Sequence, residues 1–161
     1  GARFPIISLF TVFMLQGAIM MVVSLPVQIA LSDADASLSV VSYIGLTIFA
    51  IGIFFEAVGD WQLAQFKRNP NNSGQVMQTG LWKYTRHPNY FGDTCVWWGI
   101  GVVALGASFG WVGLFGSLLM NFFLVRVSGV PMLERSMSKR RPGYDEYKRR
   151  TSSFVPRPPK K

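Results

Sequence analysis

Long apolar runs alternate along the chain with short polar segments that are rich in Lys and Arg. Residues 5–29 contain no charged side chain, and residues 39–59 contain only Glu56. A helix needs roughly 20 predominantly apolar residues to cross the hydrocarbon core of a bilayer. We therefore predict membrane spans at about 5–29 and 39–59, and two shorter spans at about 89–105 and 111–125.

The chain becomes polar and basic from Arg126, so we expect a cytoplasmic tail over 126–161. Its segment LERSMSKRRPGYDEYKRR predicts two amphipathic helices that are interrupted at Arg141-Pro142-Gly143, because Pro and Gly both disfavour a helix interior. The expected fold is an all-α, polytopic membrane helical bundle with a helical tail, forming a single membrane domain over 1–161. The chain begins "GARFP", without an initiator Met, and we expect it to be the C-terminal fragment of a longer protein.

Composition and charge agree with a membrane protein. Half of the 161 residues are hydrophobic, 15% are charged, and the mean hydropathy is +0.28, which is too apolar for an ordinary soluble domain. The net charge of +8 raises nucleic acid as a partner, but no Lys or Arg lies between Arg3 and Lys67 or between Arg86 and Arg126.

Basic residues that flank apolar spans face anionic lipid headgroups on the cytoplasmic side. We therefore exclude nucleic acid, expect the bilayer and a lipophilic small molecule as partners, and place both chain ends in the cytoplasm. The compartment would be the endoplasmic reticulum in a eukaryote or the inner membrane in a bacterium, and the oligomeric state is left open.

A dense group of unlike polar residues stands where the third span begins, in GLWKYTRHPNYFGDTCVWWG at 80–99. Pro88 excludes His87 from the α region, and Asn89 is a candidate helix N-cap. The free N–H groups of this helix start would then bind an anion beside Arg86. The pattern predicts a cytoplasmic pocket for a phosphate- or carboxylate-bearing ligand. The residues of this cluster are Arg86, His87, Asn89, Tyr90 and Asp93. The alternative is that Glu56, Asp60, Asn89 and Asp93 are ordinary interfacial polar residues, which pair with Lys and Arg side chains of the loops.

Three further features bear on this pocket. Glu56 and Asp60 are four residues apart and share a helix face. In the tail, a second cluster belongs either to an amphipathic helix on the membrane surface or to a tail that folds back and closes the pocket; its residues are Glu134, Tyr144, Tyr147 and Arg150. The single histidine and the single cysteine are too few for a usual metal site, so no metal is predicted.

Four segments together resemble the steroid 5-alpha-reductase-like membrane family, in its branch known as domain of unknown function 1295. The likeness runs from about Arg3 to the end of the chain. It implies an NADPH-dependent reductase of a carbon–carbon double bond in a lipid or steroid-like substrate, an oxidoreductase of lipid metabolism. The four segments are FFEAVGDWQLAQFK, TGLWKYTRHPNYFGDTCVWWG, SGVPMLE and RPGYDEYKRRTSSFVPRPP.

The resemblance also implies where the cofactor would bind. Asn89 and Asp93 match the family's Asn-aromatic-x-Gly-acid segment, although the acid is usually Glu. Lys67 stands where the steroid reductases have Arg, and the family's carbonyl-polarising residues precede this chain, so the catalytic residue is unknown. The predicted cofactor-binding residues are Asp60, Lys67, Arg86, His87, Asn89, Tyr90, Asp93, Glu134 and Tyr147.

Two other functions remain open. Isoprenylcysteine carboxyl methyltransferases and related lipid methyltransferases also carry an Arg-His-Pro-x-Tyr-x-Gly segment before a span and a late Glu. In them the pocket holds S-adenosylmethionine, whose carboxylate would meet either Arg86 or the helix N-terminus and whose ribose hydroxyls would meet Glu134. The third possibility is a non-enzymatic membrane scaffold, which would explain the hydrophobicity and the topology but not the polar cluster at 86–93.

Overall fold

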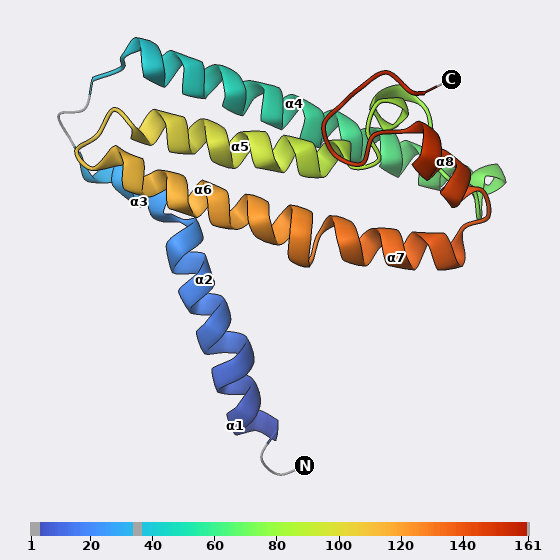
Figure 1. The fold of residues 1–161 in the computed structure, drawn as a ribbon, viewed down its shortest axis with the longest axis horizontal. Coiled ribbons are helices and arrows are strands. Elements are labelled where there is room, and N and C mark those ends of the chain that lie inside the picture. Colours follow the sequence, from blue (N-terminus) through green and yellow to red (C-terminus); the bar gives the residue numbers. More distant parts are fainter. Residues whose placement is uncertain (1–3, 34–36, 161) are drawn as a thin grey trace.

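The computed structural model describes residues 4–33 and 37–160, and every regular element in these ranges is helical. This confirms the predicted all-α class. In Figure 1 the long helices α4 and α5 and the nearly collinear pair α6 and α7 run side by side, while α1 and α2 leave the bundle at a steep angle. The C-terminal segment folds back over the end of the bundle where α4 ends and α5 begins.

The helices have the following bounds. They are α1 (Phe4–Ser8), the π-helix η1 (Leu9–Met14), α2 (Leu15–Val23), α3 (Leu25–Ser32), α4 (Val40–Arg68), the 3-10 helices η2 (Pro70–Asn72) and η3 (Gly80–Lys83), α5 (Pro88–Ala104), the 3-10 helix η4 (Gly110–Val112), α6 (Gly113–Phe122), the π-helix η5 (Phe123–Val127), α7 (Val130–Arg140) and α8 (Tyr144–Arg150).

Three helical stretches of the described chain are long and apolar enough to cross a membrane, which indicates an integral membrane protein. They are Ile6–Val23, Val40–Arg68 and Gly110–Arg140. Helix α5 corresponds to the third predicted span and has 17 residues, at the lower limit for crossing a bilayer. The first predicted span is not one straight helix, because the chain breaks at Ser24 and continues in α3 with Pro26 in its first turn.

Glycines bring α4 and α5 into backbone contact. Gly45, Gly52 and Gly59 are buried on α4, and a Cβ added at Gly52 would lie 2.6 Å from the backbone nitrogen of Val96. Such small residues let membrane helices approach closely. At the end of this contact a Cβ on Gly59 would lie 3.2 Å from the Pro88 ring. The packing therefore holds the start of α5 against the last turns of α4.

The predicted helix pair of the tail is confirmed, with α7 ending at Arg140 and α8 starting at Tyr144. Gly143 between them has a φ of 80°, a left-handed conformation that glycine adopts readily. The turn directs α8 back toward η3 and the start of α5, so the tail folds back onto the bundle.

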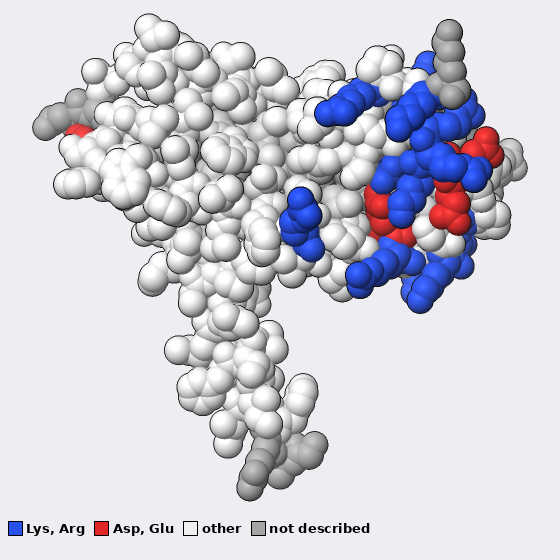
Figure 2. Space-filling view, viewed as in Figure 1, with Lys and Arg blue, Asp and Glu red and all other residues white. Residues whose placement is uncertain are grey.

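Charge separates the two ends of the bundle. Figure 2 shows Lys and Arg gathered at the end that carries α7, α8 and the C-terminal segment, whereas the opposite end is nearly free of them on this face. We call the first end, with Lys67–Arg86 and residues 126–160, the basic end. Arg3, which the charge argument also placed there, lies outside the described residues.

Candidate functional site

A cavity of about 560 Å³ lies at the basic end, between the end of α4, the 69–77 loop, and helices α7 and α8. Its volume is within the range of small-molecule sites. The walls combine apolar side chains with three cations, Lys67, Arg86 and Arg141, and with the imidazole of His87. Aromatic rings complete the lining, from Phe66, Trp82, Tyr144 and Tyr147.

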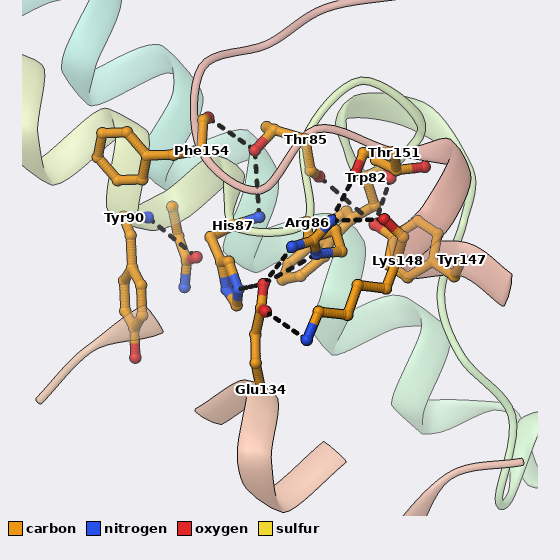
Figure 3. A network of polar contacts seen from close by, with 11 residues as sticks. Trp82, Thr85, Arg86, His87, Tyr90, Glu134, Tyr147, Lys148, Thr151 and Phe154 are labelled. Carbon is orange, nitrogen blue, oxygen red and sulfur yellow. Dashed lines mark hydrogen bonds and ion pairs between the residues drawn. The ribbon is translucent and has the colours of Figure 1, made fainter. Parts of the chain in front are cut away.

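Arg86 and Glu134 form the centre of a buried polar network (Figure 3). The guanidinium donates to Glu134 Oε1 through Nε at 2.8 Å and through Nη2 at 2.6 Å. Its Nη1 donates to the carbonyls of Lys148 and Thr151 at 2.9 and 2.5 Å. The Arg86 and Glu134 side chains are 6% and 11% exposed. The structure thus places a carboxylate of the chain itself, from α7, beside Arg86, and an external anion there stays a prediction.

His87 shares the same carboxylate. Its Nε2 lies 3.2 Å from Glu134 Oε1, its ring stacks on Tyr90 with centroids 5.5 Å apart, and only 1% of the residue is exposed. The other ring nitrogen, Nδ1, has no hydrogen-bond partner among the described residues. Lys148 approaches Glu134 Oε2 from the solvent side at 3.5 Å.

The tail folds back, and this settles the alternative that the sequence left open for Tyr147. The Tyr147 hydroxyl donates to the carbonyl of Trp82 at 2.5 Å, and the Trp82 indole donates to the carbonyl of Gly59 at 3.1 Å. These bonds join α8 to η3 and η3 to α4 across one wall of the cavity. Burial raises the pKa of the Tyr144 phenol to about 12 and also raises the pKa of Tyr147, so both phenols stay protonated at neutral pH and Tyr147 keeps the proton that it donates to Trp82.

The segment after α8, residues 151–157, is tied to the site by its backbone. Thr85 and Ser152 form a parallel β-bridge, and the Arg86 amide donates to the Ser152 carbonyl at 2.9 Å. The Thr85 hydroxyl donates to the Phe154 carbonyl at 2.7 Å. These bonds fix residues 85–87 from behind, so that Arg86 and His87 point toward α7 and the cavity.

A second group of predicted residues lies outside the lining of the cavity. Asn89 donates to Asp60 Oδ1 at 2.9 Å, which joins α5 to α4, and Asp93 follows one turn later on α5. Neither these three nor Tyr90 is among the described residues that line the cavity. Their role in cofactor binding stays a prediction.

The predicted N-cap at Asn89 is wrong. Helix α5 begins at Pro88, and His87 is the capping position, with φ −139° and ψ 63°. Proline is favoured at the first helical position because its missing N–H needs no partner there. The Asn89 side chain instead accepts from the neighbouring amide of Tyr90 at 3.0 Å. The exclusion of His87 from the α region is confirmed.

The sequence did not single out Trp82, Arg141, Lys148 and Thr151 for the site. Trp82 belongs to the resembling segment and had no role assigned, and Arg141 was treated only as a helix break. Lys148 and Thr151 reach Arg86 through backbone carbonyls, which leave no residue-type signal. Only the fold-back of the tail could reveal them.

Comparisons with known proteins place the chain in a family and identify two curated relatives. The chain is 33% identical over 98 residues, 60% of its length and 32% of the relative's, to "Probable O-methyltransferase ustE" of Ustilaginoidea virens. It is 30% identical over 112 residues, 70% of its length and 50% of the relative's, to "Nickel-cobalt-cadmium resistance protein NccN" of Alcaligenes xylosoxydans xylosoxydans. The chain thus spans half or less of these curated relatives.

No solved structure matches the chain, and the wider relation to steroid 5-alpha-reductases stays a prediction. The model of one family, described as "Protein of unknown function (DUF1295)", matches residues 2–151. This is most of the 161 residues, so the chain belongs to that family.

Proposed function

We propose that the cavity binds S-adenosylmethionine and that the protein transfers its methyl group to a lipophilic acceptor in the membrane. The observation that carries the proposal is the lining of the cavity at the basic end, which combines aromatic rings with two cations that have no ion pair among the described residues. The relative named as an O-methyltransferase supports the same reaction type. When bound, S-adenosylmethionine supplies an electrophilic methyl group on a positively charged sulfur.

The cations suit one carboxylate. Lys67 and Arg141 line the cavity, and neither makes a salt bridge with another described residue. Arg86 is already neutralised by Glu134. Two available cations match the single carboxylate of S-adenosylmethionine more closely than the phosphates of NADPH, which together carry several negative charges.

The aromatic rings suit a sulfonium. Trp82, Tyr144 and Tyr147 line the cavity, and aromatic faces attract cations by roughly 0.5–2 kcal/mol, as in the cages that bind quaternary ammonium groups. The rings of Tyr147 and Trp82 are held by the bonds from α8 to η3 and from η3 to α4, so this part of the binding surface is formed before the ligand arrives. The apolar side chains Leu133 and Met137 of α7 would keep water from the reacting group.

The second candidate is the NADPH-dependent reductase of a lipid or steroid-like double bond. The contact between Asn89 and Asp60 favours it, because it joins two residues that the resemblance assigns to the cofactor. We rank it second, since neither residue is among the described residues that line the cavity. A non-enzymatic scaffold would bind neither cofactor.

Ligand binding to the purified full-length protein in lipid nanodiscs tests these alternatives. S-adenosylmethionine at about 100 times its Kd is expected to stabilise the protein by about 2.7 kcal/mol, because a ligand of the folded state shifts unfolding by mass action. NADPH and NADH serve as comparison ligands, and isothermal titration calorimetry measures the affinities directly.

A matched pair of double variants locates the binding site. Lys67→Gln with Arg141→Gln removes the two cations of the cavity, and binding is expected to weaken at least about tenfold, or about 1.4 kcal/mol. Arg68→Gln with Arg140→Gln makes the same charge change one residue away, at exposed positions outside the lining, and should leave the affinity unchanged. Binding of NADPH alone would establish the reductase instead, and equal effects of both pairs would reject the cavity as the site.

A further inference from the structure

One polar side chain in the first apolar run lacks a hydrogen-bond partner. Gln16 lies near the middle of Ile6–Val23, which is long and apolar enough to cross a membrane, and its carboxamide makes no hydrogen bond with a described residue. Gln28, in the same apolar run, differs from it. The Gln28 amide donates to the Met21 carbonyl at 3.2 Å and to the Ser24 hydroxyl at 2.6 Å.

A carboxamide without partners is costly at this position. We call the stretch Ile6–Val23 the arm; it has no charged side chain, and none of it is buried inside the molecule. The hydrocarbon core of a bilayer offers no water as a partner, and an amide that is removed from water without hydrogen bonds loses free energy. In membranes, Gln side chains form hydrogen bonds across neighbouring helices. The position of Gln16 therefore indicates a second helix beside the arm.

We infer that two copies of this chain associate in the bilayer through their arms, with the two Gln16 carboxamides hydrogen-bonded to each other across a two-fold axis. The inference does not depend on the proposed function. A carboxamide is both a donor and an acceptor, so each copy supplies what the other lacks. In a two-fold dimer the same surface of both copies meets at the axis. A second copy therefore satisfies both amides without any further polar residue.

The shape of the chain around Gln16 admits such a partner. Gly17 follows it, and a Cβ added at Gly17 would meet nothing within 4 Å. Small residues of this kind let two membrane helices approach closely. The arm also leaves the bundle at a steep angle (Figure 1), because the chain breaks at Ser24. A second arm can therefore reach Gln16 without displacing helices α3 to α8.

The apolar side chains of the arm do not select a partner by themselves. Phe10, Phe13 and Met20 are all exposed, but lipid tails solvate such side chains about as well as another helix does. The amide pair is specific, because it forms only when the two Gln16 residues lie opposite each other. A single polar residue fixes the register of coiled coils in the same way. The dimer is therefore expected to depend on the Gln16 carboxamide.

Dimerisation of the full-length protein in lipid bilayers tests the inference. Single-molecule photobleaching of a label at the C-terminus counts the copies in each complex as the protein density is varied. We expect the wild type to dimerise, Gln16→Leu to weaken the dimer about tenfold, and Gln16→Asn, which keeps a carboxamide, to weaken it less. Thr11→Val is the matched control, because the Thr11 hydroxyl donates to the Ile7 carbonyl of its own helical stretch at 2.8 Å. A wild type that stays monomeric, or equal effects of Gln16→Leu and Thr11→Val, would reject the inference.

A photo-crosslinking amino acid identifies what lies beside the arm. At Met20, which follows Gln16 by one helical turn, we expect cross-links between two copies of the chain. The same amino acid at Leu118, which is exposed on α6, should give none. A cross-link from Met20 to another part of the same chain would show that a helix of that chain covers the arm. Cross-links to lipid alone would show that the bilayer covers it. Either result would overturn the inference.

Discussion

Removal of the Glu134 carboxylate tests whether the buried network holds the tail in place. Glu134 lies on α7 and accepts from Arg86 on the segment before α5. Arg86 in turn donates to carbonyls at the end of α8 and just after it. With Glu134→Ala the guanidinium would remain buried beside α7 with its charge unpaired. We expect the part of the tail after α7, residues 141–160, to open far more often than in the wild type.

The magnitude follows from burial and geometry. Breaking a buried ion pair by removing one partner costs about 3–5 kcal/mol, and the Arg86 side chain is 6% exposed. Arg86 would keep its two carbonyl acceptors, so we expect the lower end, about 3 kcal/mol. The contact with Lys148 adds little, because that side chain is 47% exposed and such pairs contribute less than about 1 kcal/mol.

Limited trypsin digestion measures this opening, since the tail is rich in Lys and Arg. When closing is faster than cleavage, the cleavage rate follows the open population, so about 3 kcal/mol means roughly 100-fold faster cutting. Glu134→Gln keeps an oxygen acceptor and should show an intermediate increase. Glu146→Ala is the matched control, because Glu146 and Arg150 are 65% and 59% exposed at 3.8 Å, a pair worth at most about 0.5 kcal/mol.

The comparison between the two glutamates decides the outcome. If Glu134→Ala accelerates cleavage no more than Glu146→Ala does, the tail is held by its backbone bonds to residues 84–86, and the buried pair contributes nothing measurable. The prediction is supported if Glu134→Ala accelerates cleavage only at sites after Arg140, because the opening then lies in residues 141–160 and not in the bundle.

Three further predictions concern packing and the tyrosines. Gly52→Ala should destabilise the bundle by about 1–3 kcal/mol through overpacking, because its Cβ would lie 2.6 Å from the backbone nitrogen of Val96. Gly17→Ala, which has open space around it, should be neutral or stabilising. Unfolding in detergent measures the free-energy change of both variants. Tyr147→Phe should lower the free energy of unfolding by about 1–3 kcal/mol, because it leaves the Trp82 carbonyl unpaired. Tyr84→Phe should change this free energy by close to zero, because Tyr84 is 43% exposed. Because burial raises the pKa of Tyr147, its contribution is fully present below about pH 10 and is lost as the pH rises further; the alkaline loss of stability should therefore be smaller in Tyr147→Phe.

The apolar runs located the helices, but they did not locate every helix end or break. The second predicted span ended at Gly59, but α4 continues to Arg68, since Asn69-Pro70 is the first strong helix breaker after it. The break at Ser24 was missed, because an uninterrupted apolar run masks the effect of Pro26. Hydropathy reports the length of a run and not its straightness, so the steep departure of α2 (Figure 1) could be found only in three dimensions.

The site was predictable from one side only. Arg86 and His87 are adjacent in a dense polar segment, so a local pattern identified them. Glu134 lies 48 positions after Arg86, on a helix that the sequence also allowed to rest on the membrane surface. The tail folds back over the cavity because of a turn at Gly143 and backbone bonds at Thr85 and Arg86. Residue composition reveals neither feature.

The ion pair between Arg86 and Glu134 also changes which residues are available to a ligand. Arg86 was predicted to be the cation that receives an external anion, yet its guanidinium already donates four hydrogen bonds, to Glu134 and to two carbonyls. The charge that remains for a ligand comes from Lys67 and Arg141, which lie outside the Arg-His-Pro segment. Under the proposed function, the Arg-His-Pro segment builds the wall of the cavity, and Lys67 and Arg141, which lie outside that segment, bind the anion. The salt dependence of ligand binding should then disappear in the Lys67→Gln, Arg141→Gln protein, although its Arg86 is intact.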